Sequence, residues 1–330
     1  MHVMHGCCCI GPSAVHKTSI KNRSKSFGIL TTSAGNRRSP HTTAPCLEQG
    51  IFSSLTSVMT PTFAALIVGD EILSGKRADK HLSQLIALLA ARGLSLAYAN
   101  YVSDDADRIT ATIASMAASG DVVFSFGGIG ATPDDRTRQC AAAALGRELV
   151  LHPQAKELIT LRMVETAAEK GEVFDGDNPD NIHRLNMGVF PVGADIVPNS
   201  YNRIPGFSVH TSGGCGAMYF VPGFPIMAWP MVEWVLDTHY SQHFALGSLQ
   251  ERSLVVYGAM EASLTPLMLQ LEREHPAIKV FSLPSVDHPQ HGRHVELGVK
   301  GPTAAVQLAF DGMKSALGAM AVKIGPELVR

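Results

Sequence analysis

This sequence has few cysteines and no large excess of either charge, and each of these features excludes a class of protein. The chain has 330 residues and six cysteines, of which only Cys140 and Cys215 lie beyond residue 60. Two separated cysteines cannot form the disulfide framework of a small secreted domain, so we expect a reducing, cytoplasmic environment. Lys and Arg number 27 against 29 Asp and Glu. This balance excludes a general attraction to nucleic acid or to an anionic membrane.

An uninterrupted apolar run of membrane-spanning length is also missing. The nearest candidate is CGAMYFVPGFPIMAWPMVEWVL, residues 215–236, which contains three prolines and a glutamate. Prolines at this spacing break a continuous helix, so the segment predicts a strand, a tight turn and a core helix, and no membrane partner. Hydrophobic residues make up 45% of the chain and charged residues 17%. Such a composition and length are typical of a globular protein with room for two cores.

The first 60 residues lack acids and any sustained apolar period. They contain six Lys or Arg residues and a single acid, Glu48, among many Ser and Thr residues. This composition is typical of a disordered basic tail or an organellar transit peptide, and it would also arise if the protein started at Met59. We therefore expect residues 1–60 to be a disordered extension or a mis-assigned start, followed by one domain over 61–245 and a second over 251–330.

Short apolar runs alternate with amphipathic stretches in the first domain. Strands are predicted at 63–68, 94–102 and 121–126, with helices at 78–92, after Asp104 or Asp105, and at 136–145. This β-α-β-α-β-α order predicts a three-layer α/β fold with a mostly parallel sheet. Further strands are predicted at 194–197 and 218–221, with helices at 153–170 and 225–240. The second domain is predicted to be a small α+β unit, with strands at 253–257, 278–282 and 294–299 and helices at 263–274 and 303–317.

Three turns that follow the predicted parallel strands carry glycines and acids. They are GDEILSG at 69–75, SDD at 103–105 and GGIGATPDDRT at 127–137. Ligands of open parallel sheets bind beyond the carboxyl ends of the strands. Carboxylates that converge there repel one another unless a cation lies between them, so the turns predict a divalent metal that bridges the acids to a phosphate. The alternative is that these acids only cap helices and lie in solvated turns.

The glycines match neither of the two common phosphate-binding loops. Five residues separate Gly69 from Gly75, which excludes a P-loop. Pro133 stands where the dinucleotide fingerprint needs its last glycine. The third turn still leaves backbone N–H groups free to bind an anion, and either Asp134 or Asp135 is expected to cap the following helix while the other faces the cleft.

Taken together, GDEILSG and FGGIGATPDDRT resemble the molybdopterin-binding domain shared by MoaB, Mog and the N-terminal part of CinA, the competence/damage-inducible protein. The resemblance covers about residues 62–245, and the later segments NMGVFPVGADIVPN, IPGF and VPGFP match it in order. Residues 251–330 resemble the KH-like domain that follows in CinA. The resemblance does not include the nicotinamide-nucleotide deamidase domain of CinA, so that activity is not expected.

The resemblance implies roles for particular residues. Asp104 and Asp135 match the two acids regarded as functional in the molybdopterin-adenylating relatives. Asp134 and Asp135 are our candidates for holding the metal, which we expect to be Mg²⁺, Mn²⁺ or Co²⁺. The positions that match the ligand-binding turns are Gly69, Asp70, Glu71, Gly75, Gly127, Gly128, Gly130, Thr132, Thr137, Pro222 and Gly223.

The same resemblance also shows departures, at Met187-Gly188, at 202–204 and at Met227, which affect the half of the pocket that would set specificity. For the CinA-like branch it implies metal-dependent cleavage of the pyrophosphate in ADP-ribose-type nucleotides, a hydrolase activity. One alternative is a molybdopterin adenylyltransferase or another protein of molybdenum-cofactor biosynthesis, with molybdopterin as ligand. The other is a non-catalytic module that binds a pterin or a nucleotide. We expect a homo-oligomer, and no nucleic-acid partner because the second domain has no GXXG loop.

Overall fold

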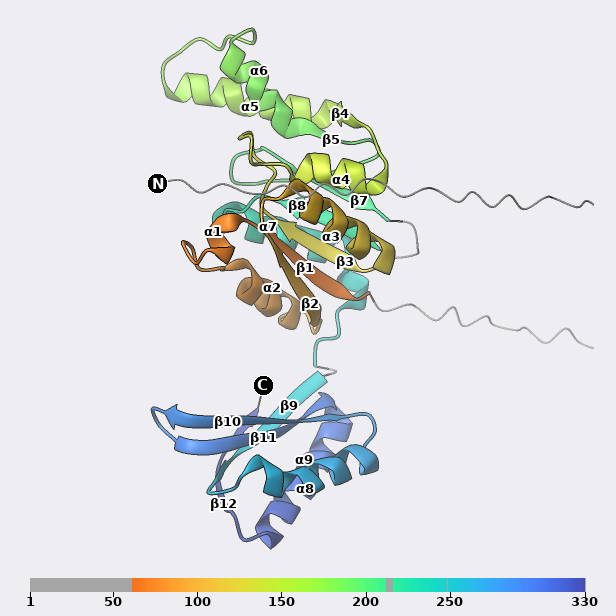
Figure 1. The fold of residues 1–330 in the computed structure, drawn as a ribbon, viewed down its shortest axis with the longest axis vertical. Coiled ribbons are helices and arrows are strands. Elements are labelled where there is room, and N and C mark those ends of the chain that lie inside the picture. The colour runs from red at the N-terminus through yellow and green to blue at the C-terminus, as the bar shows by residue number, and fades with distance from the viewer. Residues whose placement is uncertain (1–60, 212–215, 248, 330) are drawn as a thin grey trace, which may run out of the picture. The chain divides into compact units, whose positions relative to one another are not determined.

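The computed structural model describes residues 61–329, apart from 212–215 and 248. The expected basic extension at 1–60 and Cys215 therefore lie outside the described residues. The elements before and after residue 248 are described separately below, and Figure 1 shows them.

Four parallel strands form the centre of the first domain. β1 (Phe63–Val68) lies between β2 (Leu96–Val102) and β3 (Val122–Phe126), and β3 also pairs with β8 (Ala217–Val221). Every residue of β1, β3 and β8 is buried. Complete burial is typical of parallel strands whose two faces are both covered by helices. These strands were predicted, and their parallel pairing confirms the expected sheet.

Two antiparallel strands extend this sheet beyond β8. They are β7 (Gly206–His210) and β6 (Asp195–Val197), so the six-stranded order is β2-β1-β3-β8-β7-β6. Helices cover both faces. The expected three-layer, mostly parallel α/β fold is therefore confirmed, with an antiparallel end that the sequence analysis did not anticipate.

The side chains of β1 divide between the two faces of the sheet. Its odd-numbered residues pack with α2 (His81–Ala90) and α7 (Pro225–His239). Its even-numbered residues pack with α3 (Ala106–Ser119) and α4 (Thr137–Leu145). This alternation follows from the two-residue period of a strand and gives each face its own hydrophobic core.

A helical segment is inserted between α4 and β6. It contains α5 (Pro153–Glu169) and α6 (Pro179–Leu185), and it is flanked by the antiparallel pair β4 (Leu149–Leu151) and β5 (Val189–Pro191). The stretch GDNPDN, residues 176–181, has the composition of a loop. The structure starts α6 inside it, because the side chain of Asn178 caps the helix by accepting from the backbone N–H of Asp180.

The apolar stretch at 215–236 is divided as predicted. Its described part contains β8, a turn and the start of α7 (Pro225–His239). Within the described part of the chain, no helix has both the length and the apolarity needed to cross a bilayer.

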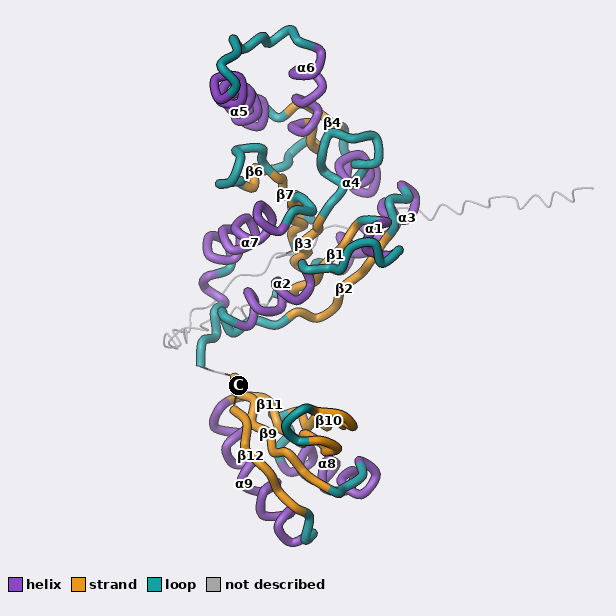
Figure 2. Tube along the Cα trace, turned by 90° about the vertical axis from the view of Figure 1, so that its left-hand side faces the viewer, coloured by secondary structure: helices purple, strands orange, loops and turns teal. Residues whose placement is uncertain are grey.

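The second domain is the expected small α+β unit with an antiparallel sheet. Its strands follow the order β10-β11-β9-β12, and two helices cover one face of the sheet (Figure 2). Each helix connects one pair of strands, which gives the split β-α-β arrangement. In chain order the elements are β9 (Leu249–Tyr257), α8 (Glu261–Glu274), β10 (Lys279–His288), β11 (Gly292–Pro302), α9 (Thr303–Ala319) and β12 (Lys323–Val329).

Candidate functional site

The three predicted turns leave neighbouring strands at the same edge of the first sheet. Val68 at the end of β1 pairs with Val102 at the end of β2, and Phe126 at the end of β3 pairs with Val221 of β8. Backbone hydrogen bonds continue past the strand ends, because Gly69 N donates to the carbonyl of Val102 at 3.1 Å. The structure therefore places the turns 69–75, 103–105 and 127–137 side by side, together with the later turn at 222–223.

The glycines of the third turn pack closely against neighbouring atoms. Gly127 has φ 97°, and an added Cβ would lie 2.6 Å from the carbonyl oxygen of Val68. Gly128 has φ 69°, and its Cβ would overlap the hydroxyl of Thr137. An added Cβ on Gly130 would lie 2.5 Å from Oδ2 of Asp135. The loop is thus packed closely against its surroundings, as a glycine-rich cradle requires.

Thr137 holds this loop in place through two hydrogen bonds. Its side chain is fully buried, its Oγ1 donates to the carbonyl of Gly127 at 3.1 Å, and its N–H donates to the carbonyl of Gly128 at 2.9 Å. Both bonds use carbonyl groups of the loop. Thr137, predicted to bind the ligand, therefore contributes by holding the loop in shape.

Asp135 turns back onto its own loop. Its Oδ2 accepts from the N–H of Thr132 at 3.0 Å and from the hydroxyl of Thr132 at 2.5 Å. The expectation that Asp134 or Asp135 caps α4 is wrong, because Arg136 is the N-cap residue and no side chain caps the helix. The physical reason is the turn closed by Asp135 N and the carbonyl of Thr132 (3.0 Å), which directs the carboxylate of Asp135 to Thr132. Asp134 is exposed.

Asp104 and Asp70 join the first two turns. The N–H of Asp70 donates to Oδ2 of Asp104 at 2.9 Å, and the N–H of Asp104 approaches Oδ1 of Asp70 at 3.4 Å. Burial raises the pKa of Asp104, and the charges of Asp70, Glu71 and Asp134 raise it further, against the lowering effect of the bond from Asp70 N. Acids from all three turns therefore act on Asp104. Asp105 is the residue that caps α3, by accepting from Arg108 N at 2.9 Å, which leaves Asp104 free for the cleft.

Glu71 lies over the start of the first turn. An added Cβ on Gly69 would be 2.7 Å from Oε2 of Glu71, so this carboxylate folds back across the glycine. Gly75 closes the same turn with φ 72° and has open space around it. The predicted residues of the first turn therefore divide into two that face other acids, Asp70 and Glu71, and two that shape the backbone.

These carboxylates suit a hard cation only in part. Among the described residues, no three His, Cys, Asp or Glu side chains are placed so that they could hold a metal ion by themselves. Mg²⁺ usually takes only one or two protein carboxylates and fills its remaining positions with water and substrate phosphates. Asp104 and Asp70 would fit that kind of site through the carboxylate oxygens that their mutual backbone contacts leave free, and Asp135 likewise has one oxygen that does not bond to Thr132. The assignment of a metal to Asp134 and Asp135 stays a prediction.

His81 is a site residue that the sequence analysis missed. It lies on α2, where its Nε2 is 3.1 Å from the carbonyl oxygen of Gly223, and its ring stacks on Phe126 with a centroid distance of 4.6 Å. The side chain is buried, and burial lowers its pKa. Gly223 in turn approaches Gly127, because its added Cβ would be 3.5 Å from the Cα of that residue. His81 thus ties the Pro222-Gly223 turn to the glycine loop.

A pocket of about 240 Å³ adjoins the glycine loop on its other side. The loop contributes Thr132 and Asp135 to its lining, α4 contributes Arg138, and the inserted segment contributes His183 and Asn186. Sequence reasoning missed the last three residues, since nothing in their local pattern marks them. The inserted segment thus forms one wall of a hollow whose other wall is the predicted loop.

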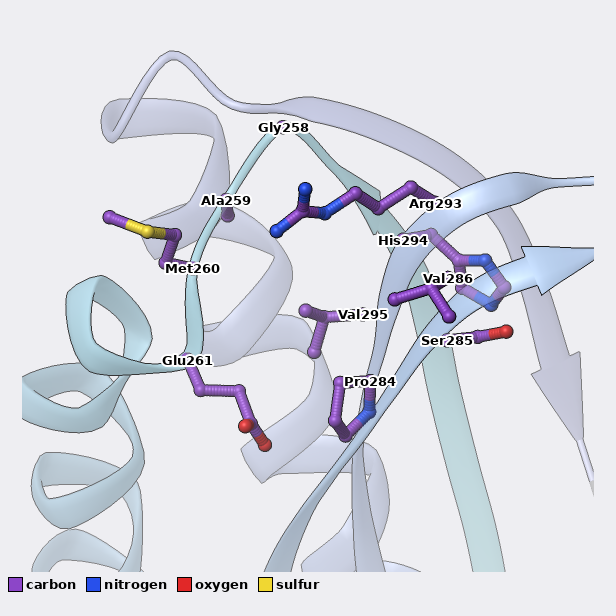
Figure 3. Close-up of a pocket in the computed structure, with 10 residues that line it drawn as sticks. All are labelled: Gly258, Ala259, Met260, Glu261, Pro284, Ser285, Val286, Arg293, His294 and Val295. Atoms are coloured by element: carbon purple, nitrogen blue, oxygen red, sulfur yellow. The ribbon is translucent and has the colours of Figure 1, made fainter.

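A larger hollow of about 550 Å³ lies in the second domain (Figure 3). Arg293 and Glu261 stand on opposite sides of an apolar floor that includes Pro284 and Val295. The carboxylate of Glu261 accepts a hydrogen bond from Ser282. None of the residues that line this hollow comes from the three turns.

Curated relatives are similar to this chain over most of its length. This chain spans about half the length of the CinA-like relatives. A CinA-like protein of Desulforapulum autotrophicum is 31% identical over 222 residues, which cover 65% of this chain and 49% of the relative. Another, from Anaeromyxobacter sp. (strain K), is 31% identical over 246 residues and covers 74% and 56%. A protein of Pyrobaculum calidifontis is 28% identical over 248 residues and covers 74% and 90%.

Solved structures with low identity also match about half of this chain. A CinA protein of unknown function from Thermoplasma acidophilum is 24% identical with a TM-score of 0.44, covering 53% of this chain and 97% of that one. The molybdopterin biosynthesis enzyme MoaB of Thermus thermophilus is 21% identical with a TM-score of 0.35, covering 55% and 93%.

The match to a family model agrees with the residues of the site. The model is described as "Probable molybdopterin binding domain", and it matches residues 64–240, which include all three turns and the turn at 222–223. This match covers more than half of the chain. The protein therefore belongs to the molybdopterin-binding domain family of the MoaB/Mog type, with CinA-like proteins among its relatives.

Proposed function

We propose that this protein binds a nucleotide or pterin phosphate at the carboxyl edge of its first sheet and, with a divalent cation, hydrolyses the pyrophosphate of ADP-ribose-like nucleotides. The observation that supports this most strongly is the pairing of Asp104 with Asp70 across two turns, beside the glycine loop. A divalent cation bound by these acids would offset their charge and bridge them to a phosphate in the cradle.

Each group would have a separate task in this reaction. The backbone N–H groups of residues 128–130 would face the phosphates, whereas that of Gly127 already donates to the carbonyl of Val221. Asp104 and Asp70 would hold the cation, and Thr137 and Asp135 would keep the loop in its shape. A bound divalent cation would supply Lewis acidity and lower the pKa of a water molecule.

The alternative of a molybdopterin adenylyltransferase has its own support, because the matching family model is described as a probable molybdopterin binding domain. Against it stand the departures at 202–204 and Met227. Asn202 donates from Nδ2 to Sδ of Met227 at 3.4 Å, so two of the altered positions contact each other. Gly188, a third departure, packs against Ala155 and Ile159. Because these positions depart from the pattern of the family, we rank the pterin-specific reaction second. A non-catalytic binding module ranks third.

Turnover of a defined set of nucleotides tests the proposal directly. The protein starting at Met59 is incubated with ADP-ribose, FAD, NAD or ATP and with Mg²⁺, Mn²⁺ or Co²⁺, and the products are separated by chromatography. We expect AMP and ribose 5-phosphate from ADP-ribose, and loss of turnover when the cation is chelated. Isothermal titration with molybdopterin is run in parallel. Micromolar binding of molybdopterin with no cleavage of any nucleotide would favour the alternative.

A further inference from the structure

Arg138 is a buried cation without a carboxylate partner. Its side chain lies on α4 and the residue is only 4% exposed. Nη1 donates to the carbonyl of Asn186 at 2.5 Å, and Nη2 donates to the carbonyl of Gly130 at 2.6 Å. In the part of the chain that the structure describes, no ion pair includes Arg138.

Burying an arginine in this way is costly. A guanidinium keeps its charge in proteins, and its removal from water must be offset by an opposite charge or by full hydrogen bonding. Two carbonyl groups occupy two of its five N–H donors and supply no net charge. Burial lowers the pKa of Arg138, and the nearby charge of Asp135 opposes this effect, although among the described residues no hydrogen bond or ion pair joins the two side chains. Arg138 thus retains both positive charge and donors.

Arg138 lines a pocket that a ligand could enter. Besides Arg138, its polar lining includes Thr132, Gln139, His183 and Asn186, and it contains one carboxylate, that of Asp135, whose Oδ2 accepts from Thr132. Its volume of about 240 Å³ exceeds that of a single small anion, since one water takes about 30 Å³ in the liquid. It is below the range of about 300–1,000 Å³ that holds a whole drug-sized ligand. The pocket is therefore sized for one end of a larger ligand.

His183 helps to orient the wall of the pocket that the inserted segment forms. Its Nε2 donates to the carbonyl of Ala131 at 2.9 Å, and Nδ2 of Asn186 approaches its Nδ1 at 3.4 Å. The carbonyl of Asn186 at the same time accepts from Arg138. The inserted segment is thus connected to the glycine loop through hydrogen bonds on both sides of the pocket, and its polar groups are held in place.

We propose that this pocket is a second anion subsite, in which Arg138 binds a phosphomonoester carried on a sugar at one end of the ligand. The inference rests on the proposed function for its substrate class: among ADP-ribose-like nucleotides, those with an additional ribose phosphate are preferred. It does not require catalysis, because the pocket is formed without the Asp70–Asp104 pair.

Binding of small probes tests the subsite without any turnover. Ribose 5-phosphate and ribose are titrated into the protein by calorimetry without metal, at low and at high salt. We expect ribose 5-phosphate to bind at least tenfold more tightly than ribose, and this difference to shrink at high salt. Equal affinities of the two sugars would overturn the proposal.

Variants locate the binding in this pocket. Arg138→Met is expected to abolish the preference for the phosphate, but it also leaves two carbonyls without donors. Gln139→Glu avoids that problem, since Gln139 is exposed on α4 and lines the pocket. The added carboxylate should weaken ribose 5-phosphate at least tenfold. Gln154→Glu, the same change on α5 outside the pocket, should leave the affinity unchanged. Unchanged affinity in Gln139→Glu would refute the subsite.

Hydrolysis separates this inference from the proposed function. ADP-ribose and 2′-phospho-ADP-ribose are compared in wild type and in Gln139→Glu, and we expect the phosphorylated substrate to lose its advantage in kcat/KM in the variant. Binding of ribose 5-phosphate that responds to Gln139→Glu, without cleavage of either nucleotide, would keep the subsite and reject the hydrolase. Cleavage of both nucleotides at equal rates would keep the hydrolase and reject the subsite.

Discussion

Asp104 and Asp105 are neighbours in the sequence, yet their side chains do different work. Asp105 caps α3 and is exposed, while Asp104 faces the acids of two other turns and is partly buried. The sequence placed both at a helix start and could not tell which was the cap. That choice depends on the direction of the chain after β2, which sends the carboxylate of Asp104 toward the N–H of Asp70.

Replacing Asp104 with Asn should stabilise the fold while it impairs function. The pKa of Asp104 is raised by burial and by neighbouring acids, so at neutral pH the folded protein carries a charge that the unfolded chain accommodates more easily. Asn keeps an oxygen for the N–H of Asp70. We expect a gain below about 1 kcal/mol in the free energy of unfolding at pH 7, since the site is largely solvated.

The gain from Asp104→Asn should depend on pH in one direction. An acid whose pKa is raised on folding destabilises the folded state fully above the folded pKa, and not at all below the unfolded pKa. The advantage of Asn should therefore be present at pH 7 and disappear as the pH falls toward about 4, the ordinary value for Asp. Urea unfolding at several pH values measures it. Asp105→Ala, which removes the cap, should instead cost about 1 kcal/mol at neutral pH. A pH-independent gain for Asp104→Asn would show that the charge of Asp104 is not its cause.

At the scale of the elements, the glycine loop and α4 form one unit. Gly128 has φ 69°, and Gly146 at the end of α4 has φ 61°. Alanine at either position would adopt a left-handed conformation that costs about 1–2 kcal/mol. At Gly146 nothing lies within 4 Å of the added Cβ, but at Gly128 the Cβ would also overlap the buried hydroxyl of Thr137.

Gly128→Ala should therefore be the more damaging of two matched substitutions. We expect Gly146→Ala to cost only the conformational penalty, and Gly128→Ala to cost at least about 1 kcal/mol more, since an overpacked core typically loses about 1–3 kcal/mol. Chemical denaturation of both variants gives the difference. Phosphate binding should fall in Gly128→Ala alone. Equal destabilisation of the two variants would show that Thr137 can move away at no cost.

The elements that could be predicted from the sequence are those whose own residues determine their structure. β1 is a continuous apolar run, β3 is apolar apart from Ser125, and α3 has a clear apolar stripe and an Asp cap. The strands β7 (Gly206–His210) and β12 (Lys323–Val329) were missed, because short or polar segments become strands only by pairing with a neighbour. β10 was predicted to end at Ser282, but it continues past Pro284, which is tolerated because β10 is an edge strand.

The same distinction applies to the candidate site. The three turns could be placed together from the sequence, since consecutive parallel strands end at one edge of a sheet. His81, Arg138 and His183 could not, because their partners are distant in the sequence: His81 contacts Gly223, and Arg138 contacts the carbonyl of Asn186. Only the folded chain shows these contacts.

At the scale of the whole molecule, no residue belongs to the hydrophobic cores of both domains. The first domain buries its apolar side chains on the two faces of one sheet, and the second buries a separate cluster between its sheet and its two helices. The division into domains at 61–245 and 251–330 stays a prediction. Leu246, in the connection between them, is 68% exposed.

Separate cores predict separate unfolding. Calorimetry should show two transitions, and mild proteolysis should cut near Leu246, because exposed connections are the preferred sites of cleavage. Met313→Ala removes a fully buried side chain of the second core and should lower only one transition, at a cost of about 2–5 kcal/mol. A single transition that shifts as a whole in Met313→Ala would mean that the two domains unfold as one unit.

The order of strands in the first sheet has a consequence for synthesis of the chain. β1, β2 and β3 can pair as soon as residue 126 has left the ribosome, but the other edge of β3 pairs with β8, which begins at Ala217. At about 5–20 residues per second, that interval lasts roughly 5–20 s. During it the nascent chain presents an open edge of five residues that are all buried in the finished sheet. Unpaired apolar edges of this kind recruit other chains, so chains that stall between β3 and β8 should be prone to aggregation.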